Sequence, residues 1–267
     1  MSALNPSTDL LGVRISLVIR NGNVNTYFWL ISADSLQTDM RMPFYVEVTN
    51  KRILIIGGGA EGTKRAAKYA KAGARVTVLA KDFDANLQNL LSAGIIETVK
   101  GDVSNNQLVD QLIDDSDLVM VALDTNEYND ALVASAHRAG KFINLTNDST
   151  STEMIVPVED QVRGIRLAAT SEGKSVHVTR EALQRAASFL EQQSDLWILL
   201  DLMQELRQTL KRRGIPLEKR MRIYPVVYWN KSVREQAAAN HIEEARTAMD
   251  TAVSRELQMI ASGRPDT

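Results

Sequence analysis

Residues 51–62, Lys-Arg-Ile-Leu-Ile-Ile-Gly-Gly-Gly-Ala-Glu-Gly, decide the fold of this chain. The apolar run ends at Ile56 and leads directly into a loop with the spacing G-x-G-x-x-G. In this spacing the first glycine permits a tight turn, the second lets the backbone approach a pyrophosphate, and the third lets a helix pack closely on the strand. The first turn of that helix offers its N–H groups to the phosphates. The stretch therefore predicts a dinucleotide-binding loop. Its candidate cofactor-binding residues are Gly57, Gly59, Ala60, Glu61 and Gly62.

The sequence on both sides of this loop alternates between short apolar runs and amphipathic stretches. Gly73 and Gly140 stand where a glycine commonly follows the last turn of a helix. Strands that alternate with helices at this spacing predict an α/β fold with a doubly wound parallel sheet, of the Rossmann type. The predicted strands are 51–56, 75–79, 95–99, 118–122 and 142–145, and the predicted helices are 60–72, 83–93, 108–113 and 126–139.

Two charged residues follow the second predicted strand, where a dinucleotide site carries the side chain that meets the adenosine ribose. Asp82 can accept hydrogen bonds from the ribose hydroxyls of NAD, whereas Lys81 can meet the 2′-phosphate of NADP. A third interpretation is a solvated turn, because charged turn residues usually face water. We favour NAD as the cofactor and include both residues in the candidate site.

The pattern changes on either side of the predicted sheet. We divide the chain into an N-terminal extension (1–41), a dinucleotide-binding domain (42–150), a dimerisation region (151–194) and a helical C-terminal domain (195–267). The extension is either a hairpin of 13–19 and 26–31 or a stretch before the true start at Met40 or Met42. The later regions predict strands at 154–158 and 165–169, and helices at 179–193, 196–212 and 232–260.

Composition excludes several classes of protein. With no cysteine, the chain cannot form disulfides, thiolate metal sites or a cysteine nucleophile, and only three histidines are present. The net charge of −2 gives no reason to expect a nucleic-acid partner. We find no apolar run of about 18 residues and no signal peptide, so we expect a cytoplasmic protein without membrane contact.

Several motifs, taken in order, resemble the siroheme synthase N-terminal family, the precorrin-2 dehydrogenases. The resemblance covers about residues 42–190. It rests on Met42-Pro43-Phe44, on the triple glycine, on Ala72-Gly73-Ala74-Arg75-Val76-Thr77-Val78, on Ala122-Leu123-Asp124 through Asn129, on Asn144-Leu145-Thr146-Asn147, on Met154-Ile155-Val156-Pro157, and on Ser171 through Arg180.

This resemblance implies NAD-dependent oxidation of the tetrapyrrole precorrin-2 to sirohydrochlorin by a homodimer, with iron or cobalt insertion in some members. It adds Asp124 to the cofactor-binding candidates, and Ser171, Lys174 and Arg180 to the substrate-binding ones. The region after the dinucleotide-binding domain would form the dimer contact, and the helical tail would help to close the substrate cleft.

The catalytic candidates are Asn147 and Asp148. The family's frequent aspartate falls on Asn147, which cannot take up a proton at neutral pH, so either Asp148 replaces it or metal insertion is lost. Asp148 can instead simply form a turn. The basic stretches 211–213 and 219–222 suit a carboxylate-rich substrate, or they are solvated helix ends.

Two other functions stay open beside the dehydrogenase. The first is a nucleotide-sensing Rossmann module that binds without turnover. The second is an oxidoreductase with a small substrate. Since no tyrosine among Tyr69, Tyr128, Tyr224 and Tyr228 has a lysine four residues on, the sequence disfavours a short-chain dehydrogenase. We also weigh His177 as a proton carrier, and Tyr224, Tyr228 and Trp229 as stacking residues, against ordinary packing.

Overall fold

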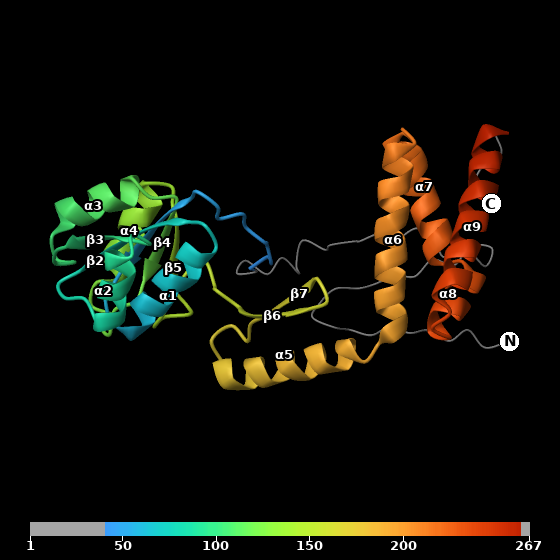
Figure 1. Ribbon diagram of the computed structural model, residues 1–267. Helices are drawn as coiled ribbons and strands as arrows, with labels where there is room; N and C mark the ends of the chain where they lie inside the picture. Colours follow the sequence, from blue (N-terminus) through green and yellow to red (C-terminus); the bar gives the residue numbers. More distant parts are fainter. Residues whose placement is uncertain (1–40, 263–267) are drawn as a thin grey trace, which may run out of the picture. The chain divides into compact units, whose positions relative to one another are not determined.

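The computed structural model describes residues 41–262, which form two compact units (Figure 1). The first comprises the described residues through Asn147 together with Ser151–Met154, and the second comprises Asp148–Thr150 and the chain from Ile155 onward. The predicted N-terminal extension and its hairpin lie outside the described residues, apart from Arg41. Residues 41–48, which include the Pro-aromatic segment, have no regular secondary structure.

The first unit is built on one parallel sheet in the order β3-β2-β1-β4-β5. The chain crosses from β3 at one edge to β4 beside β1, so the direction of winding reverses between β1 and β4. The predicted doubly wound sheet is therefore confirmed. Its elements are β1 (Arg52–Ile56), α1 (Ala60–Lys71), β2 (Arg75–Ala80), α2 (Ala85–Ser92), β3 (Glu97–Lys100), α3 (Asn106–Asp114), β4 (Leu118–Val121), α4 (Asn129–Arg138) and β5 (Phe142–Leu145).

Helices cover both faces of this sheet, α1 and α2 on one side and α3 and α4 on the other (Figure 1). The strands are almost continuously apolar because both faces are buried. Leu54 and Ile56 pack into a core with Val109 and Ile113 of α3 and Leu132 of α4. The predicted glycine after α1 is confirmed, because Gly73 has a φ of +85° and follows the C-cap.

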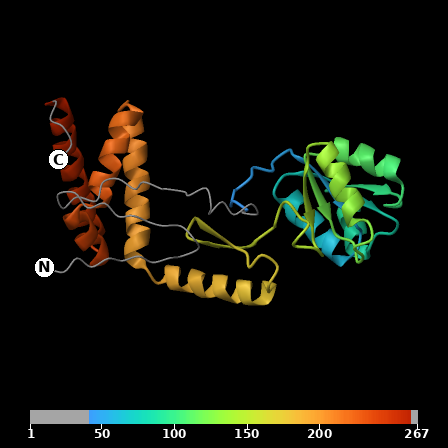
Figure 2. The ribbon, with the colours of Figure 1, turned by 180° about the vertical axis from the view of Figure 1, so that it is seen from behind.

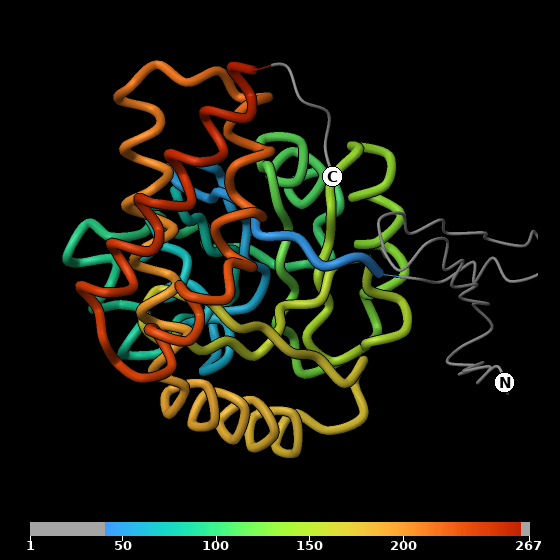
Figure 3. The backbone as a smooth tube through the Cα atoms, turned by 90° about the vertical axis from the view of Figure 1, so that its right-hand side faces the viewer, coloured from blue at the N-terminus to red at the C-terminus, as the bar shows by residue number. Residues whose placement is uncertain are grey.

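The second unit begins with a hairpin and one helix. The hairpin pairs β6 (Val158–Val162) with β7 (Ile165–Ala169), and α5 (Val176–Glu191) packs on it as one continuous helix (Figure 3). A small core of Val162, Ala187 and Trp197 joins the hairpin and α5 to the start of α6.

Four helices complete the second unit: α6 (Ser194–Arg212), α7 (Leu217–Tyr228), α8 (Lys231–Ala238) and α9 (Ile242–Ala261) (Figure 2). Their buried leucine, isoleucine and valine side chains form a core separate from that of the hairpin, with Leu210, Ile223 and Val227 fully buried.

Two predictions about this region were wrong. Residues 154–157 do not form a strand, since Pro157 has no N–H for a ladder, and the chain makes only isolated contacts such as Met154 N–H to the Ile143 carbonyl. The predicted helix 232–260 is two helices, α8 and α9. The break lies at Asn240, whose φ of +60° ends α8, while His241 N–H donates back to the Gln236 carbonyl. Helix α7 was not predicted.

Candidate functional site

The candidate site lies where the strands of the first unit end. In open α/β sheets the ligand crevice forms outside the carboxyl ends of the strands, where the winding reverses. Here that point is between β1 and β4. The glycine loop follows β1, and Ala122-Leu123-Asp124 follows β4. Gly57 N–H donates to the Leu79 carbonyl of β2, so the loop is tied to the sheet where it begins.

Two glycines of the loop are required by the backbone itself. Gly57 has a φ of +121°, and a Cβ there would lie 2.2 Å from the Ala122 carbonyl oxygen. A Cβ on Gly62 would lie 2.0 Å from the Gly57 carbonyl oxygen. These contacts bring β1, α1 and the end of β4 together more closely than any side chain allows. The roles predicted for the first and third glycines therefore fit the structure.

Gly59 differs from Gly57 and Gly62, because the structure of the protein itself does not require a glycine there. It therefore tests whether the loop fits a bound dinucleotide. Its φ of −78° suits any residue, and no atom lies within 4 Å of the position of a Cβ. Neither strain nor protein packing therefore calls for glycine there. It is exposed and stands at the N-cap of α1, where a pyrophosphate would meet the free N–H groups of the helix. Ala60 and Glu61 are exposed beside it.

Sequence reasoning missed the role of Gly58. A Cβ on Gly58 would lie 2.5 Å from the Asp82 carbonyl oxygen, and Asp84 N–H donates to the Gly58 carbonyl at 3.2 Å. The loop after β2 is therefore held directly against the glycine loop. The signal was the middle one of the three consecutive glycines, which the G-x-G-x-x-G spacing does not need.

Lys81 and Asp82, the candidates for the ribose position, each lie near an opposite charge from β3 or from the loop that follows it. Lys81 Nζ lies 2.7 Å from Asp102 Oδ2, and Lys100 Nζ lies 3.9 Å from Asp82 Oδ1. The hydrogen bond to Asp102 raises the pKa of Lys81. The same bond, helped by the Ser104 N–H, lowers the pKa of Asp102. Asp102 was not predicted, because the register that pairs β3 with β2, and so brings Asp102 to Lys81, cannot be read from sequence spacing alone.

Asn147, predicted as catalytic, acts as a clamp in the structure. Its Nδ2 donates to the Leu123 carbonyl at 3.2 Å and to the Thr125 carbonyl at 3.1 Å. Its Oδ1 accepts from Asn129 Nδ2 at 3.3 Å. The side chain therefore fixes the loop after β4 that presents the exposed Asp124. An aspartate could not donate these two hydrogen bonds.

We expect Asn147→Asp to lower the free energy of unfolding by about 2 kcal/mol at neutral pH, because two donors are lost and a carboxylate faces two carbonyls. Thermal denaturation measures this change, and hydrogen exchange at residues 122–128 locates it. Asn147→Ala removes the donors without adding charge and should cost less. If the Asp and Ala variants are equally stable, the carboxylate does not face the carbonyls as described.

Asp148 lies with the predicted substrate loop. Its Oδ1 accepts from Thr150 N–H at 2.8 Å and from Thr150 Oγ1 at 2.7 Å, which is a turn of the kind weighed above. A Cβ on Gly173 would lie 2.2 Å from Ser149 Oγ, so this turn packs against the loop 171–175. Ser171 Oγ accepts from Ser175 N–H at 3.0 Å and shapes that loop.

The remaining cations fall into two groups. Lys174 and Arg180 are exposed at the start of α5, and among the described residues neither forms an ion pair. By contrast, Arg222 is paired with Glu256 at 2.7 Å, and Arg220 Nε donates to the Ile215 carbonyl at 3.0 Å. The basic stretch of α7 is therefore partly structural.

The other residues weighed from the sequence are spread over the second unit. Tyr224 and Tyr228 are partly buried against the helical core, whereas Trp229 is exposed. His177 is exposed on α5. In the described part of the chain, no group of three or more histidines and carboxylates could hold a metal ion. No helix of residues 41–262 is long and apolar enough to cross a membrane.

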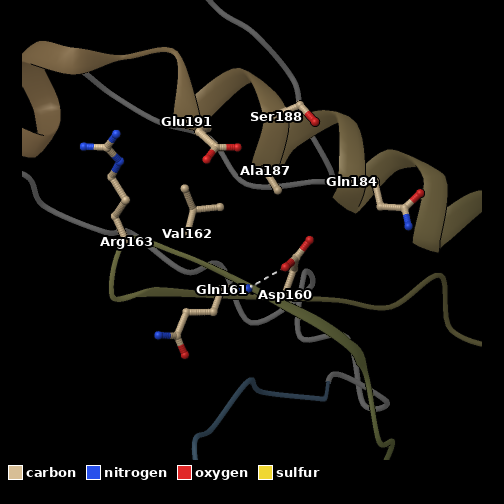
Figure 4. A pocket seen from close by; sticks show the side chains of 8 residues that line it. All are labelled: Asp160, Gln161, Val162, Arg163, Gln184, Ala187, Ser188 and Glu191. Atoms are coloured by element: carbon tan, nitrogen blue, oxygen red, sulfur yellow. Dashed lines mark hydrogen bonds between the residues drawn. The ribbon is translucent and has the colours of Figure 1, made fainter.

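A separate hollow of about 440 Å³ lies between the β6–β7 hairpin and α5 (Figure 4). Its walls carry both signs of charge, with Asp160 and Arg163 on the hairpin and Glu191 on the helix. Asp160 Oδ1 accepts from the Gln161 N–H, and Arg163 lies 5.9 Å from the centre of the Trp197 ring. The first of these contacts lies within β6 and the second joins the hairpin to α6. None of the predicted site residues lines the hollow.

The sheet, its switch point and the glycine loop define an NAD(P)-binding protein of the Rossmann type. Residues 44–158 match the family described as putative NAD(P)-binding. The described chain also has the fold of the precorrin-2 dehydrogenase SirC, with a TM-score of 0.55 at 14% identity over 79% of this chain and 98% of that one.

The chain is also similar to curated siroheme synthases. Siroheme synthase 3 of Aeromonas hydrophila subsp. hydrophila is 25% identical over 84% of this chain and 48% of its own length. Siroheme synthase 2 of Yersinia enterocolitica serotype O:8 is 26% identical over 75% of this chain and 40% of its own length. The resemblance to the siroheme synthase N-terminal family is therefore confirmed. The chain spans less than half the length of these relatives.

Proposed function

We propose that this chain is a precorrin-2 dehydrogenase, which oxidises precorrin-2 to sirohydrochlorin with NAD in siroheme biosynthesis. The observation that carries the proposal is Gly59, a glycine that neither the backbone nor the packing requires, at the point where a pyrophosphate would meet α1. The siroheme synthase relatives supply the substrate class.

The reaction removes a hydride and a proton from the macrocycle. Bound NAD supplies the hydride acceptor. The glycine loop and α1 hold the pyrophosphate, and the loops after β2 and β4 hold the rest of the dinucleotide, with Asp82 and Asp124 as the candidate partners.

For the proton we propose Asp148 as the base. The hydrogen bonds from Thr150 fix the position of its carboxylate. Its turn packs against the loop of Ser171 and Lys174, the proposed substrate loop. The role of Asn147 is to position the loop after β4 rather than to move a proton, and we do not propose metal insertion.

Lys174 and Arg180 are proposed to bind substrate carboxylates. Both are exposed and neither forms an ion pair among the described residues, so a carboxylate can bind them without breaking an existing ion pair. The apolar side chains of Val176, Val178 and Phe189, each more than half exposed on α5, support a homodimer through residues 151–194. Light scattering from the purified chain measures the mass of the oligomer, which we expect to be that of two chains. The cytoplasmic location and the absence of a nucleic-acid partner remain predictions.

Anaerobic incubation of the purified chain with precorrin-2 and NAD tests the function. We expect sirohydrochlorin and NADH to appear together. The visible spectrum measures the sirohydrochlorin, and the absorbance of NADH measures the reduced cofactor. Asp148→Asn should lower kcat at least about 100-fold while NAD still binds. Clear NAD binding without turnover would instead favour the nucleotide-sensing module.

A further inference from the structure

The loops after β2 and β3 carry a fixed pair of opposite charges. Lys81 Nζ and Asp102 Oδ2 are 2.7 Å apart, and Asp102 Oδ1 accepts from Ser104 N–H at 3.0 Å. Gly101 N–H donates to the Ala80 carbonyl at 3.0 Å, which extends the pairing of β2 with β3 up to the ion pair. The aspartate is thus held by its own loop and holds the lysine in turn.

This pair cannot move far from the glycine loop. The carbonyl oxygen of Asp82 would lie 2.5 Å from a Cβ on Gly58, and Asp84 N–H donates to the Gly58 carbonyl. Any dinucleotide on the glycine loop must therefore place its adenosine ribose beside residues 81 and 82. Lys81 is the nearest cation in sequence to that position.

The charges at this edge cancel. Lys81 is paired with Asp102, and Lys100 lies 3.9 Å from Asp82, so two cations face two carboxylates. Ribose hydroxyls meet a neutral edge at no electrostatic cost. A 2′-phosphate brings close to two negative charges among these carboxylates, and the charge of the Lys81 ammonium that it would meet is already neutralised by Asp102.

We propose that Asp102 sets the cofactor preference of this chain, as a positioning residue that withholds Lys81 from a 2′-phosphate and so favours NAD over NADP. This inference rests on the proposed binding of a nicotinamide dinucleotide. It makes the loop after β3, rather than only the residues after β2, a determinant of specificity.

The test compares the dissociation constants of NAD and NADP for the full chain by isothermal titration calorimetry. Asp102→Asn keeps the shape and the acceptor for Ser104 but removes the charge. We expect the wild-type chain to prefer NAD, and the variant to shift the ratio toward NADP by roughly ten-fold, since a phosphate then gains a charge-assisted hydrogen bond. Higher ionic strength should reduce this shift.

Two further variants make the result specific. Lys81→Ala combined with Asp102→Asn should lose the gain for NADP, because the lysine is its source. Asp114→Asn makes the same change of charge on an exposed residue at the end of α3, just before β4 begins. This residue lies near the amino ends of the strands, away from the glycine loop, so the variant should leave the ratio unchanged. The Lys81–Asp102 pair is exposed, so the melting temperature of Asp102→Asn should match that of the wild type.

The outcomes separate the inference from the proposed function. If NAD binds and the ratio is the same in Asp102→Asn as in the wild type, the role of Asp102 is wrong while the dinucleotide site stands. A wild-type chain that prefers NADP would also overturn the inference. If neither dinucleotide binds, both this inference and the proposed dehydrogenase fall.

Discussion

Replacing Gly59 by aspartate should reduce the affinity for NAD by about 100-fold or more while leaving the fold intact. The backbone of Gly59 suits any residue, and nothing lies within 4 Å of its Cβ position. Aspartate is also a preferred N-cap, so the stability of α1 should change by only a few tenths of a kcal/mol. In the complex, however, its carboxylate would stand against the pyrophosphate. Calorimetric titration with NAD and thermal denaturation measure the two effects.

Two controls separate charge, size and strain at the glycine loop. Gly59→Asn has nearly the same shape as the aspartate variant without its charge, and should lose less affinity. Gly62→Ala should instead lower the stability of the fold. Its Cβ would lie 2.0 Å from the Gly57 carbonyl oxygen, so the loop would have to open. That variant should lose about 3 kcal/mol of stability. Wild-type affinity in Gly59→Asp would mean that the pyrophosphate does not approach this glycine.

The contrast between these glycines shows how much of the candidate site could be predicted from the sequence. The strand, the loop and the helix after it were predictable, because the turn residues and the apolar run are local signals. The loops after the other strands of the sheet were predictable as parts of the site, since parallel strands end at one edge. The partners of their side chains were not, because Asp102 meets Lys81 only through the packing of β3 on β2.

Asn147 illustrates the same limit for chemistry. A family comparison predicts catalysis at this position, whereas the structure engages its amide in hydrogen bonds to Leu123, Thr125 and Asn129. Residue type excludes proton transfer, but only the geometry supplies the alternative role. In the helical region the break at Asn240 was missed because alanine and glutamate on both sides favour helix, and one left-handed residue decides the turn.

The basic stretch of α7 leads to the second large effect. Arg222 Nε lies 2.7 Å from Glu256 Oε1, and the exposed fractions of the two side chains are 29% and 3%. Glu256 is on α9, so the pair joins two helices of the same core. Removing the arginine leaves a buried carboxylate without its charge partner, which is among the costliest single changes in a protein.

We therefore expect Arg222→Met to lower the free energy of unfolding by about 3 kcal/mol. Urea denaturation measures the loss, and hydrogen exchange in α7 and α9 locates it. Lys219→Met removes an exposed cation from the same stretch and should have little effect on stability. The double variant Arg222→Met with Glu256→Met replaces the ion pair by apolar side chains and should recover most of the stability.

These variants also distinguish structure from substrate binding in the basic stretch. If Arg222 served mainly to bind a carboxylate of the tetrapyrrole, the double variant would fold but would still have a raised KM. Because the arginine already neutralises Glu256, we expect the double variant to recover turnover together with stability. Lys174→Met and Arg180→Met, which break no ion pair within the described chain, should instead raise KM without loss of stability. A double variant that is stable but has a high KM would mean that Arg222 binds the substrate.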